Sequence, residues 1–349
     1  MINRHPAAPG RTVRMVVVGL RFGRTMLQTL GGSPRIDLVG VCDLDQDLAA
    51  AVAADQGLRH YADLDEILAD PDVAAVGLFT SPVGRAALLS RIVRAGKPVV
   101  TTKPFEIDPD RARAVLDEAR DRAVVVRLNS PSSSPTTELA LVDQWRAQHD
   151  LGRPIGAQAA VWASYQEAPD GSWYDDPLLC PAAPITRLGV YLVNDLVRLM
   201  GPAKRVQVLS SRVRTGRPTA DNAQLALTFQ GGALATVFAS FCVDDGLAYG
   251  NELTVHYERG TVSRARAEQP GMVDLILVKQ GQPVETCSVP DIPDGGYDLA
   301  EFVSSVRSGA VISADETRRI VAGVAVLEAA GRAERSGAVE VVRPIGSEQ

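Results

Sequence analysis

One stretch near the start of the chain, Thr12 to Asp43, constrains the fold more than any other. It begins with an apolar, β-branched run, Val13 to Val18, which ends at a glycine. Such a run is typical of a strand buried on both faces of a parallel sheet. A helical spacing of apolar residues follows, and a second apolar run, Ile36 to Cys42, leads to Asp43. Strand, glycine turn, helix, strand and acid, in this order, indicate a dinucleotide-binding βαβ unit.

The turn of this unit reads Gly19-Leu20-Arg21-Phe22-Gly23, and we expect all five residues to contact the cofactor. Gly19 permits the tight turn, and Gly23 lets the helix begin close to the sheet, so that the free N–H groups of the helix face a pyrophosphate. Arg21 replaces the middle glycine of the usual pattern, and its guanidinium can cover the adenine or pair with a phosphate. A structural turn in another α/β protein is the alternative, which the helix and the acid together disfavour.

The acid at the tip of the second strand predicts which cofactor binds. Asp43 lies 24 residues after Gly19, close to the spacing of about 20 in dinucleotide-binding domains. Its carboxylate can accept hydrogen bonds from two free ribose hydroxyls, whereas a 2′-phosphate would meet the charges of Asp43 and Asp45. The sequence therefore predicts NAD(H). A pairing between Arg21 and a 2′-phosphate would favour NADP(H) instead.

Strands and helices alternate up to about residue 128, which predicts a doubly wound parallel sheet of about six strands. In such sheets ligands bind beyond the carboxyl ends of the strands. We therefore expect further cofactor contacts at the ends of the later strands, from Thr80, Pro82, Lys103, Pro104 and Asn129.

The chain after residue 129 has a different pattern. A serine- and proline-rich stretch, Asn129 to Pro135, predicts a crossing between domains. From Pro154 onward, most strands follow one another without helices between them, which predicts an α+β domain with a largely antiparallel open sheet. We thus expect a disordered tail (1–11), a dinucleotide-binding Rossmann domain (12–129) and an α+β substrate-binding and oligomerisation domain (130–349). The open sheet face predicts a homo-oligomer, a dimer or a tetramer.

Composition excludes several classes of function. A net charge of −6 and no basic cluster argue against a nucleic-acid surface. No apolar run approaches the roughly 20 residues that span a bilayer. The four cysteines and four histidines lie in separate segments, so we expect reduced thiols and no metal centre. These features predict a cytoplasmic protein that acts on a small molecule.

The chain resembles the Gfo/Idh/MocA oxidoreductases, the family of glucose–fructose oxidoreductase and inositol dehydrogenases, over about residues 12 to 343. The resemblance rests on the glycine turn, on Val41-Cys42-Asp43 and on two further motifs. The stretch Gly96 to Pro104 is similar to the family's G-K-x-V-x-x-E-K-P, with Thr102 in place of the glutamate. The stretch Arg187 to Tyr191 falls where the family usually has D-x-G-x-H.

The resemblance implies roles for several residues. Lys103 is expected to reach the substrate beside the nicotinamide, and Tyr191 falls where most members carry a catalytic histidine. Tyr191 followed by Asn194 is similar to the glucose–fructose oxidoreductase branch. The loop from Trp173 to Pro177, which contains Tyr174, resembles a segment that borders the substrate. Arg187 falls where an acid often helps to bind the substrate or tune the catalytic group.

The chemistry of an alcohol oxidation supports Tyr191 and Lys103, because some side chain must take the hydroxyl proton. Free tyrosine, with a pKa near 10, is a poor base, but a nearby ammonium or guanidinium favours the phenolate. A core aromatic and a surface lysine are the respective alternatives. Three roles are open for Arg187: a partner of Tyr191, a bidentate grip on an anionic substrate, or a plain surface or helix-start arginine. Asn194 binds a substrate hydroxyl or is a polar helix residue.

These features together predict an NAD(P)-dependent oxidoreductase that transfers a hydride between nicotinamide and a sugar, a polyol or a sugar-like carbinol or ketone. One alternative is a reductase of a C=N or keto intermediate in a biosynthetic pathway. The other is a cofactor-binding protein without turnover, which the substitutions at Arg21, Thr102 and Arg187 suggest.

Overall fold

The computed structural model describes residues 12–292, 296–297 and 299–344, so the tail expected over residues 1–11 lies outside the described residues. The chain divides into two compact units. Of the described residues, the first unit takes those up to Glu106, then Asp110–Asn129 and Tyr297–Thr317. The second takes Ile107–Pro109, Ser130–Gly296 and those from Arg318 onward.

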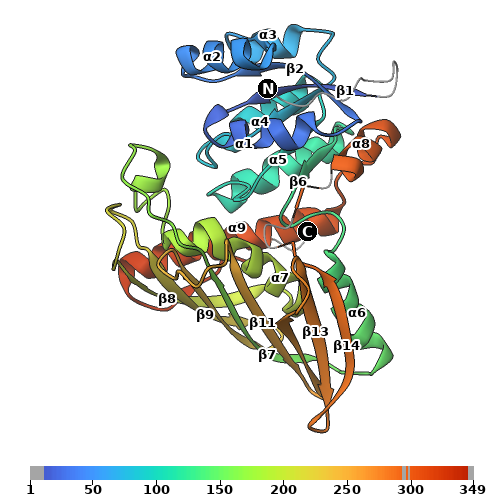
Figure 1. Ribbon diagram of the computed structural model, residues 1–349, viewed down its shortest axis with the longest axis vertical. Coiled ribbons are helices and arrows are strands. Elements are labelled where there is room, and N and C mark those ends of the chain that lie inside the picture. Colours follow the sequence, from blue (N-terminus) through green and yellow to red (C-terminus); the bar gives the residue numbers. More distant parts are fainter. Residues whose placement is uncertain (1–11, 293–295, 298, 345–349) are drawn as a thin grey trace. The chain divides into compact units, whose positions relative to one another are not determined.

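The first unit is built on a parallel sheet of six strands in the order β3-β2-β1-β4-β5-β6, which confirms the doubly wound prediction (Figure 1). Its strands are β1 (Val13–Val18), β2 (Ile36–Cys42), β3 (Arg59–His60), β4 (Ala75–Leu78), β5 (Val99–Thr101) and β6 (Val126–Leu128). The intervening helices are α1 (Leu20–Gly31), α2 (Gln46–Gln56), α3 (Leu64–Ala69), α4 (Arg85–Arg94) and α5 (Pro109–Asp121).

Local sequence explains where these elements begin. Strand β1 lies at the centre of the sheet, and Met15, Val16 and Val17 are fully buried in it. Asp45 caps α2 by accepting a hydrogen bond from the Leu48 amide, and Asp63 caps α3 in the same way. The result is a rigid sheet whose strand ends hold the candidate residues.

The first unit also contains a segment from the far end of the chain, Tyr297–Thr317, with helix α8 (Leu299–Ser308). Phe302 and Val303 of α8 are each 1% exposed and belong to the hydrophobic cluster of β1 and α1. The Arg127 guanidinium donates to the carbonyl of Ala310 at 3.0 Å. The sequence analysis placed this segment in the second domain, and the structure differs because the apolar face of α8 is buried in the first unit's core.

The second unit is built on a nine-stranded sheet in the order β14-β13-β12-β11-β7-β10-β9-β8-β15. Among the described strands of this sheet, only β7 and β10 pair in parallel, so the prediction of a largely antiparallel sheet is confirmed. Its strands are β7 (Pro154–Trp162), β8 (Ala203–Ser211), β9 (Asn222–Phe229), β10 (Leu234–Ser240), β11 (Gly250–Tyr257), β12 (Gly260–Arg266), β13 (Met272–Lys279), β14 (Gln282–Pro290) and β15 (Glu340–Val341).

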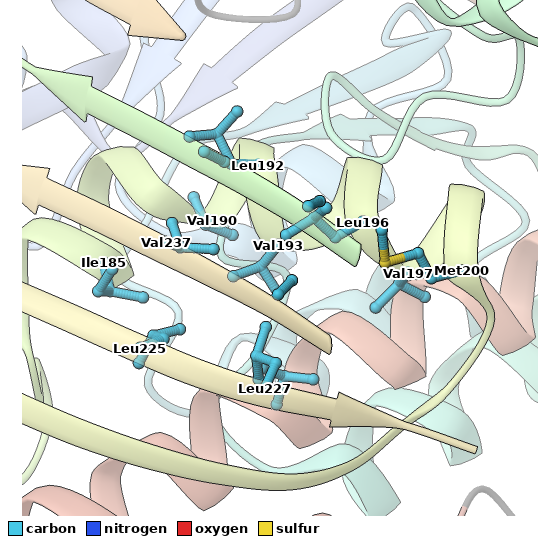
Figure 2. Close-up of a cluster of buried hydrophobic side chains, with 14 of the residues drawn as sticks. Ile185, Val190, Leu192, Val193, Leu196, Val197, Met200, Leu225, Leu227 and Val237 are labelled. Atoms are coloured by element: carbon cyan, nitrogen blue, oxygen red, sulfur yellow. The ribbon is translucent and has the colours of Figure 1, made fainter. Parts of the chain in front are cut away.

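Helices cover one face of this sheet. They are α6 (Thr137–Gln148), α7 (Val190–Met200) and most of α9 (Ala314–Ser336). Figure 2 shows how the apolar face of α7, with Val190, Val193 and Val197, packs against Leu225, Leu227 and Val237 of the sheet. This packing fixes α7, the helix that carries Tyr191.

The start of α7 is not regular. The apolar spacing from Ile185 to Met200 suits one continuous helix, but Ile185–Gly189 forms a π turn, η2, before α7 begins. A Cβ on Gly189 would lie 3.0 Å from Ile185 Cδ1 and 3.6 Å from Ala239 Cβ, so glycine lets the turn approach β10 closely. Single π turns within helices often accompany functional sites.

Candidate active site

The turn between β1 and α1 has the backbone geometry that a dinucleotide requires. Gly19 has φ of 87°, and a Cβ there would lie 2.8 Å from the Thr80 amide nitrogen, so this position accepts only glycine. A Cβ on Gly23 would lie 3.0 Å from Val17 Cγ1, which holds α1 close to the sheet. The first turn of α1 has no acidic side chain and no side-chain cap, which leaves its positive end suited to an anion. Arg21 is exposed on that turn.

Asp43 lies directly against this helix end. Its Oδ2 accepts from the Leu20 amide at 2.5 Å, and its Oδ1 accepts from the Asp45 amide at 3.0 Å. Each carboxylate oxygen keeps a further lone pair for a ribose hydroxyl. The carboxylate is therefore already oriented where a ribose beside the helix end would need it.

Aromatic and hydroxyl groups continue the site along the strand ends. Phe22 packs edge-on to Phe79, and Phe79 packs edge-on to Tyr297, with ring centroids 6.1 and 6.3 Å apart. The Tyr297 hydroxyl donates to Thr102 Oγ1 at 2.6 Å. The Thr80 hydroxyl is buried and has no hydrogen-bond partner among the described residues, which leaves it free for a ligand. The turn, the carboxylate and this hydroxyl together fit a nicotinamide dinucleotide.

Lys103 differs in exposure from its neighbours in the segment that follows β5. Of the residues Thr101 to Glu106, it alone is not buried. Thr101 Oγ1 donates to the Leu78 carbonyl at 2.7 Å, which ties β5 to β4 just before the lysine. Pro82 and Pro104 are both buried, so they shape the strand-end loops from within. The backbone around Lys103 is thus held inside the unit while its side chain reaches the surface.

In the second unit, Tyr191 and Asn194 lie on α7 in different surroundings. Tyr191 is half-buried against the core cluster. Asn194 is 5% exposed, and its Nδ2 donates to Ser130 Oγ at 2.9 Å. A Cβ on Gly323 of α9 would lie 2.1 Å from the Oδ1 atom of Asn194, so α9 approaches this side chain closely. Asn194 is therefore hydrogen-bonded to Ser130, in the stretch that crosses between the domains, which favours the interpretation as a polar helix residue.

Arg187 lies on the π turn, and its side chain is only 11% exposed. Its guanidinium makes two hydrogen bonds to the Glu167 carboxylate, at 2.7 and 2.8 Å. It lies over the ring of Tyr174, 4.0 Å from the centroid, and also faces Phe241 and Tyr165. The interpretation as a plain surface arginine is therefore wrong, because the side chain is stacked and paired inside the unit.

A second buried arginine fixes the loop that carries Trp173 and Tyr174. Arg217, which is 7% exposed, donates to Glu167, Asp170 and Asp175 at 3.1, 3.1 and 2.6 Å. Thr219 Oγ1 also donates to the Tyr174 carbonyl at 2.9 Å. These bonds fix the residues from Glu167 to Asp175, which include the short helix η1 (Trp173–Asp175).

The charges of this cluster settle the protonation of Glu167. Burial alone would raise the pKa of its carboxyl, but hydrogen bonds and charges from Arg187 and Arg217 outweigh burial and lower the pKa below its ordinary value. Glu167 is therefore ionised at neutral pH. Burial also raises the pKa of the Tyr174 phenol, against the opposing charge of Arg187. The stacked guanidinium is thus neutralised by a carboxylate and not by a phenolate.

Comparisons with known proteins agree with this geometry. Residues 13–130 match the model of the oxidoreductase family with an NAD-binding Rossmann fold, and residues 139–263 match the GFO/IDH/MocA C-terminal domain. Inositol 2-dehydrogenase 1 of Saccharopolyspora erythraea is 31% identical over 264 residues, which are 73% of this chain and 74% of that protein.

The chain belongs to the Gfo/Idh/MocA family of oxidoreductases. The 1,5-anhydro-D-fructose reductase of Ensifer adhaerens is 23% identical over 80% of this chain and 91% of that protein. The crystal structure of GenD2 from gentamicin A biosynthesis, in complex with NAD, has a TM-score of 0.75 at 21% identity, over 99% of this chain and all of that one, which shows a shared fold.

Membership of the Gfo/Idh/MocA family makes the first unit an NAD-binding Rossmann domain and the protein an oxidoreductase, as the sequence analysis predicted. Within the described part of the chain, no helix combines the length and the apolar character that crossing a membrane requires.

Sequence reasoning missed several residues of this site. Glu167, Arg217 and Arg85 lie in segments that have no motif, and Tyr297 lies far along the chain from its partner Thr102. A run of acids around the two aromatics of the loop, Asp170, Asp175 and Asp176, was the one available signal that a buried cation lies near them.

Proposed function

We propose that this protein is an NAD(H)-dependent dehydrogenase or reductase that acts on a secondary alcohol or ketone of an uncharged sugar or polyol. The bidentate pair between Arg187 and Glu167 is the observation that supports an uncharged substrate. Family membership supports the reaction class, and the relatives named above include proteins that act on inositol and on an anhydro sugar.

The roles in the reaction follow from the residues of each unit. When bound, the nicotinamide supplies or accepts the hydride. Gly19, Asp43 and the first turn of α1 hold the pyrophosphate and the adenosine ribose. We assign Lys103 the donation of a hydrogen bond to the substrate oxygen. We assign Tyr191 the exchange of a proton with that oxygen, which a positive charge beside the phenol would assist by favouring the phenolate.

The loop that carries Trp173 and Tyr174 gives the proposal its substrate specificity. The rings of Trp173 and Tyr174 lie next to each other, tilted by 45°, and the Arg187 guanidinium lies over Tyr174. Aromatic rings with polar groups beside them suit the faces and hydroxyls of a sugar ring. A carboxylate or phosphate that sought the same bidentate grip would have to displace Glu167, since Glu167 occupies the Nη1–Nη2 edge of the guanidinium. An uncharged substrate avoids that competition.

We also propose that the protein is a homo-oligomer in which a second copy covers the open face of the nine-stranded sheet. Leu209 and Leu234 point from this face and are 71% and 59% exposed. Large exposed apolar side chains on one continuous sheet face are typical of protein interfaces. Light scattering behind a sizing column would give the mass, and Leu234→Arg should yield the monomer. A monomeric wild type would contradict this proposal.

A substrate panel tests the proposed reaction. We would follow nicotinamide absorbance with NAD+ and myo-inositol, D-glucose or D-glucuronate, and with NADH and 1,5-anhydro-D-fructose. Glucose and glucuronate form a matched pair, because they differ by one carboxylate. We expect turnover of at least one neutral compound and a higher kcat/KM for glucose than for glucuronate. A clear preference for glucuronate would contradict the uncharged substrate, and binding of NADH without turnover of any panel compound would favour a protein that only binds the cofactor.

A further inference from the structure

The most deeply buried cation of the first unit is Arg85, the first residue of α4, whose side chain is 1% exposed. Its Nη1 donates to the Thr102 carbonyl at 2.6 Å, and it also donates to the carbonyl of Pro104. Its Nη2 donates to the carbonyl of Thr80. A buried guanidinium requires such partners, because an uncompensated charge in the interior is strongly unfavourable.

These carbonyls belong to two loops that follow neighbouring strands. Thr80 follows β4, and Thr102 and Pro104 follow β5. The next residue of the helix reinforces the link, since the Ala86 amide donates to the buried Glu106 carboxylate at 2.8 Å. The start of α4 thus ties both strand-end loops together through two adjacent residues.

Lys103 lies between the two carbonyls of its own loop that Arg85 binds. The Thr102 carbonyl belongs to the peptide group directly before Lys103, and the Pro104 carbonyl comes one residue after it. Fixing these two carbonyls fixes the direction in which the lysine side chain leaves the backbone. Thr101 Oγ1 already joins β5 to β4 through the Leu78 carbonyl, so the sheet pairing itself does not depend on Arg85.

We propose that Arg85 is a positioning residue for Lys103: it holds the lysine in the place from which it meets the substrate. This inference rests on the proposed function, which gives Lys103 its role. A displacement of a reacting group by about 1 Å can cost about 10²-fold in rate. We therefore expect Arg85→Lys, which keeps the charge but lacks the fork that spans both loops, to lower the hydride-transfer rate about 10²-fold.

The first experiment needs no substrate. Amide hydrogen exchange of the peptide that contains residues 99–106 should become at least about 10-fold faster in Arg85→Lys, because the loop loses its anchor. The peptide of β2 should be unchanged. Arg91→Met on the exposed side of the same helix, where Arg91 pairs with Asp65 at the surface, is the matched control and should alter neither peptide. Unchanged exchange in Arg85→Lys would overturn the proposal.

The second experiment separates positioning from general stability. Single-turnover rates are measured for wild type, Arg85→Lys, Lys103→Ala and the double variant, with the panel compound that the wild type turns over. If Arg85 acts through Lys103, Arg85→Lys slows wild type about 10²-fold but slows Lys103→Ala less than about threefold. Additive losses would overturn the proposal and leave the proposed function intact. Full activity of Lys103→Ala would instead contradict the role that the proposed function gives Lys103.

Should Arg85→Lys fail to fold, Arg85→Gln with added guanidinium chloride at millimolar concentration provides another test. Guanidinium fits the vacated space, so it should restore the rate at least about 10-fold in Arg85→Gln and have no such effect on Lys103→Ala. Absence of restoration in a folded Arg85→Gln would count against the positioning role.

Discussion

The two units position their candidate residues by different physical means. In the first unit, Gly19, Asp43 and Lys103 follow directly after parallel strands, so the sheet brings them to one edge. In the second unit, the candidate residues lie on a loop and a π turn, and ion pairs between segments far apart in the chain fix them. Backbone pairing therefore places the cofactor site, whereas buried side-chain charges place the loop of the second unit and, through Arg85, fix the strand-end loop of Lys103.

This difference predicts where each unit tolerates change. A strand end keeps its position when a side chain that bonds no backbone group of the loop is altered, because the backbone ladder and the Arg85 anchor still hold it. A loop fixed by two buried arginines loses its order when one is removed, because the remaining carboxylates then repel one another. The following substitutions compare the two units directly.

The largest expected effect concerns turnover and the strand-end lysine. Lys103→Ala should lower the single-turnover rate about 10²–10³-fold, the usual cost of removing one hydrogen-bond donor to a reacting oxygen, and should leave the melting temperature nearly unchanged because the sheet and Arg85 still hold the loop. Stopped-flow absorbance measures the rate. Lys204→Ala, an exposed lysine of β8, is the control and should behave as wild type. Full activity of Lys103→Ala would contradict the assignment.

The next effect concerns the stability of the second unit. Arg217→Met should lower the free energy of unfolding by about 3 kcal/mol, the lower end for a broken buried pair, because Asp170 stays 46% exposed. Urea titration followed by fluorescence measures it. Thr80→Val at a strand end of the first unit should change stability by less than about 0.5 kcal/mol, since the hydroxyl has no partner among the described residues. Equal losses for both variants would abolish the contrast between the units.

A smaller effect is expected on cofactor affinity. Asp43→Asn should weaken NADH binding about 10-fold, since hydrogen bonds to a charged group contribute about 1.5–3 kcal/mol, and should weaken NADPH binding less. Fluorescence titration with both cofactors measures this. Asp47→Asn, on the exposed first turn of α2, is the control. Tighter binding of NADPH than NADH by wild type would mean that Arg21 outweighs Asp43.

The smallest effect concerns the pH dependence of stability. Burial, with the nearby charge of Glu138, raises the pKa of Asp195 to about 7 from its ordinary value of about 4. The folded state therefore keeps a proton between pH 4 and 7 that the unfolded state has lost, so stability falls as the pH rises through that window. Asp195→Asn should remove this slope and raise the melting temperature by a few degrees at pH 8. Parallel pH profiles for the two proteins would show that Asp195 does not carry the effect.

The fold of the first unit could be predicted because strand and helix periods alternate clearly from Val13 onward and each strand ends at a recognisable turn. The packing of α8 in this unit could not be predicted. The sequence of an amphipathic helix shows that one of its faces is apolar, but not which core buries that face. The π turn at Ile185 was missed because the apolar spacing from Ile185 to Met200 suits one continuous helix.

Side-chain partners were the least predictable part of the candidate site. Glu167 and Arg187 are 20 residues apart, and neither lies in a pattern that indicates the other. Arg85 at the start of a helix resembles a surface residue in sequence, and only the folded strand ends show that it is enclosed by carbonyl groups. Asn194 illustrates the reverse case, because its place on α7 suggested a ligand contact and the structure gives it Ser130 as a partner.

The measurement that tests the account most directly is the single-turnover rate of Tyr191→Phe on the compound that the wild type turns over, together with its affinity for NADH. We predict a rate about 10²–10⁴-fold lower with NADH affinity unchanged, because the phenol belongs to the second unit and the dinucleotide site to the first. Tyr249→Phe removes another phenol hydroxyl of the second unit, one that is hydrogen-bonded to Tyr165, and should keep the wild-type rate. Full turnover by Tyr191→Phe would contradict the assignment of the proton-exchanging group to α7.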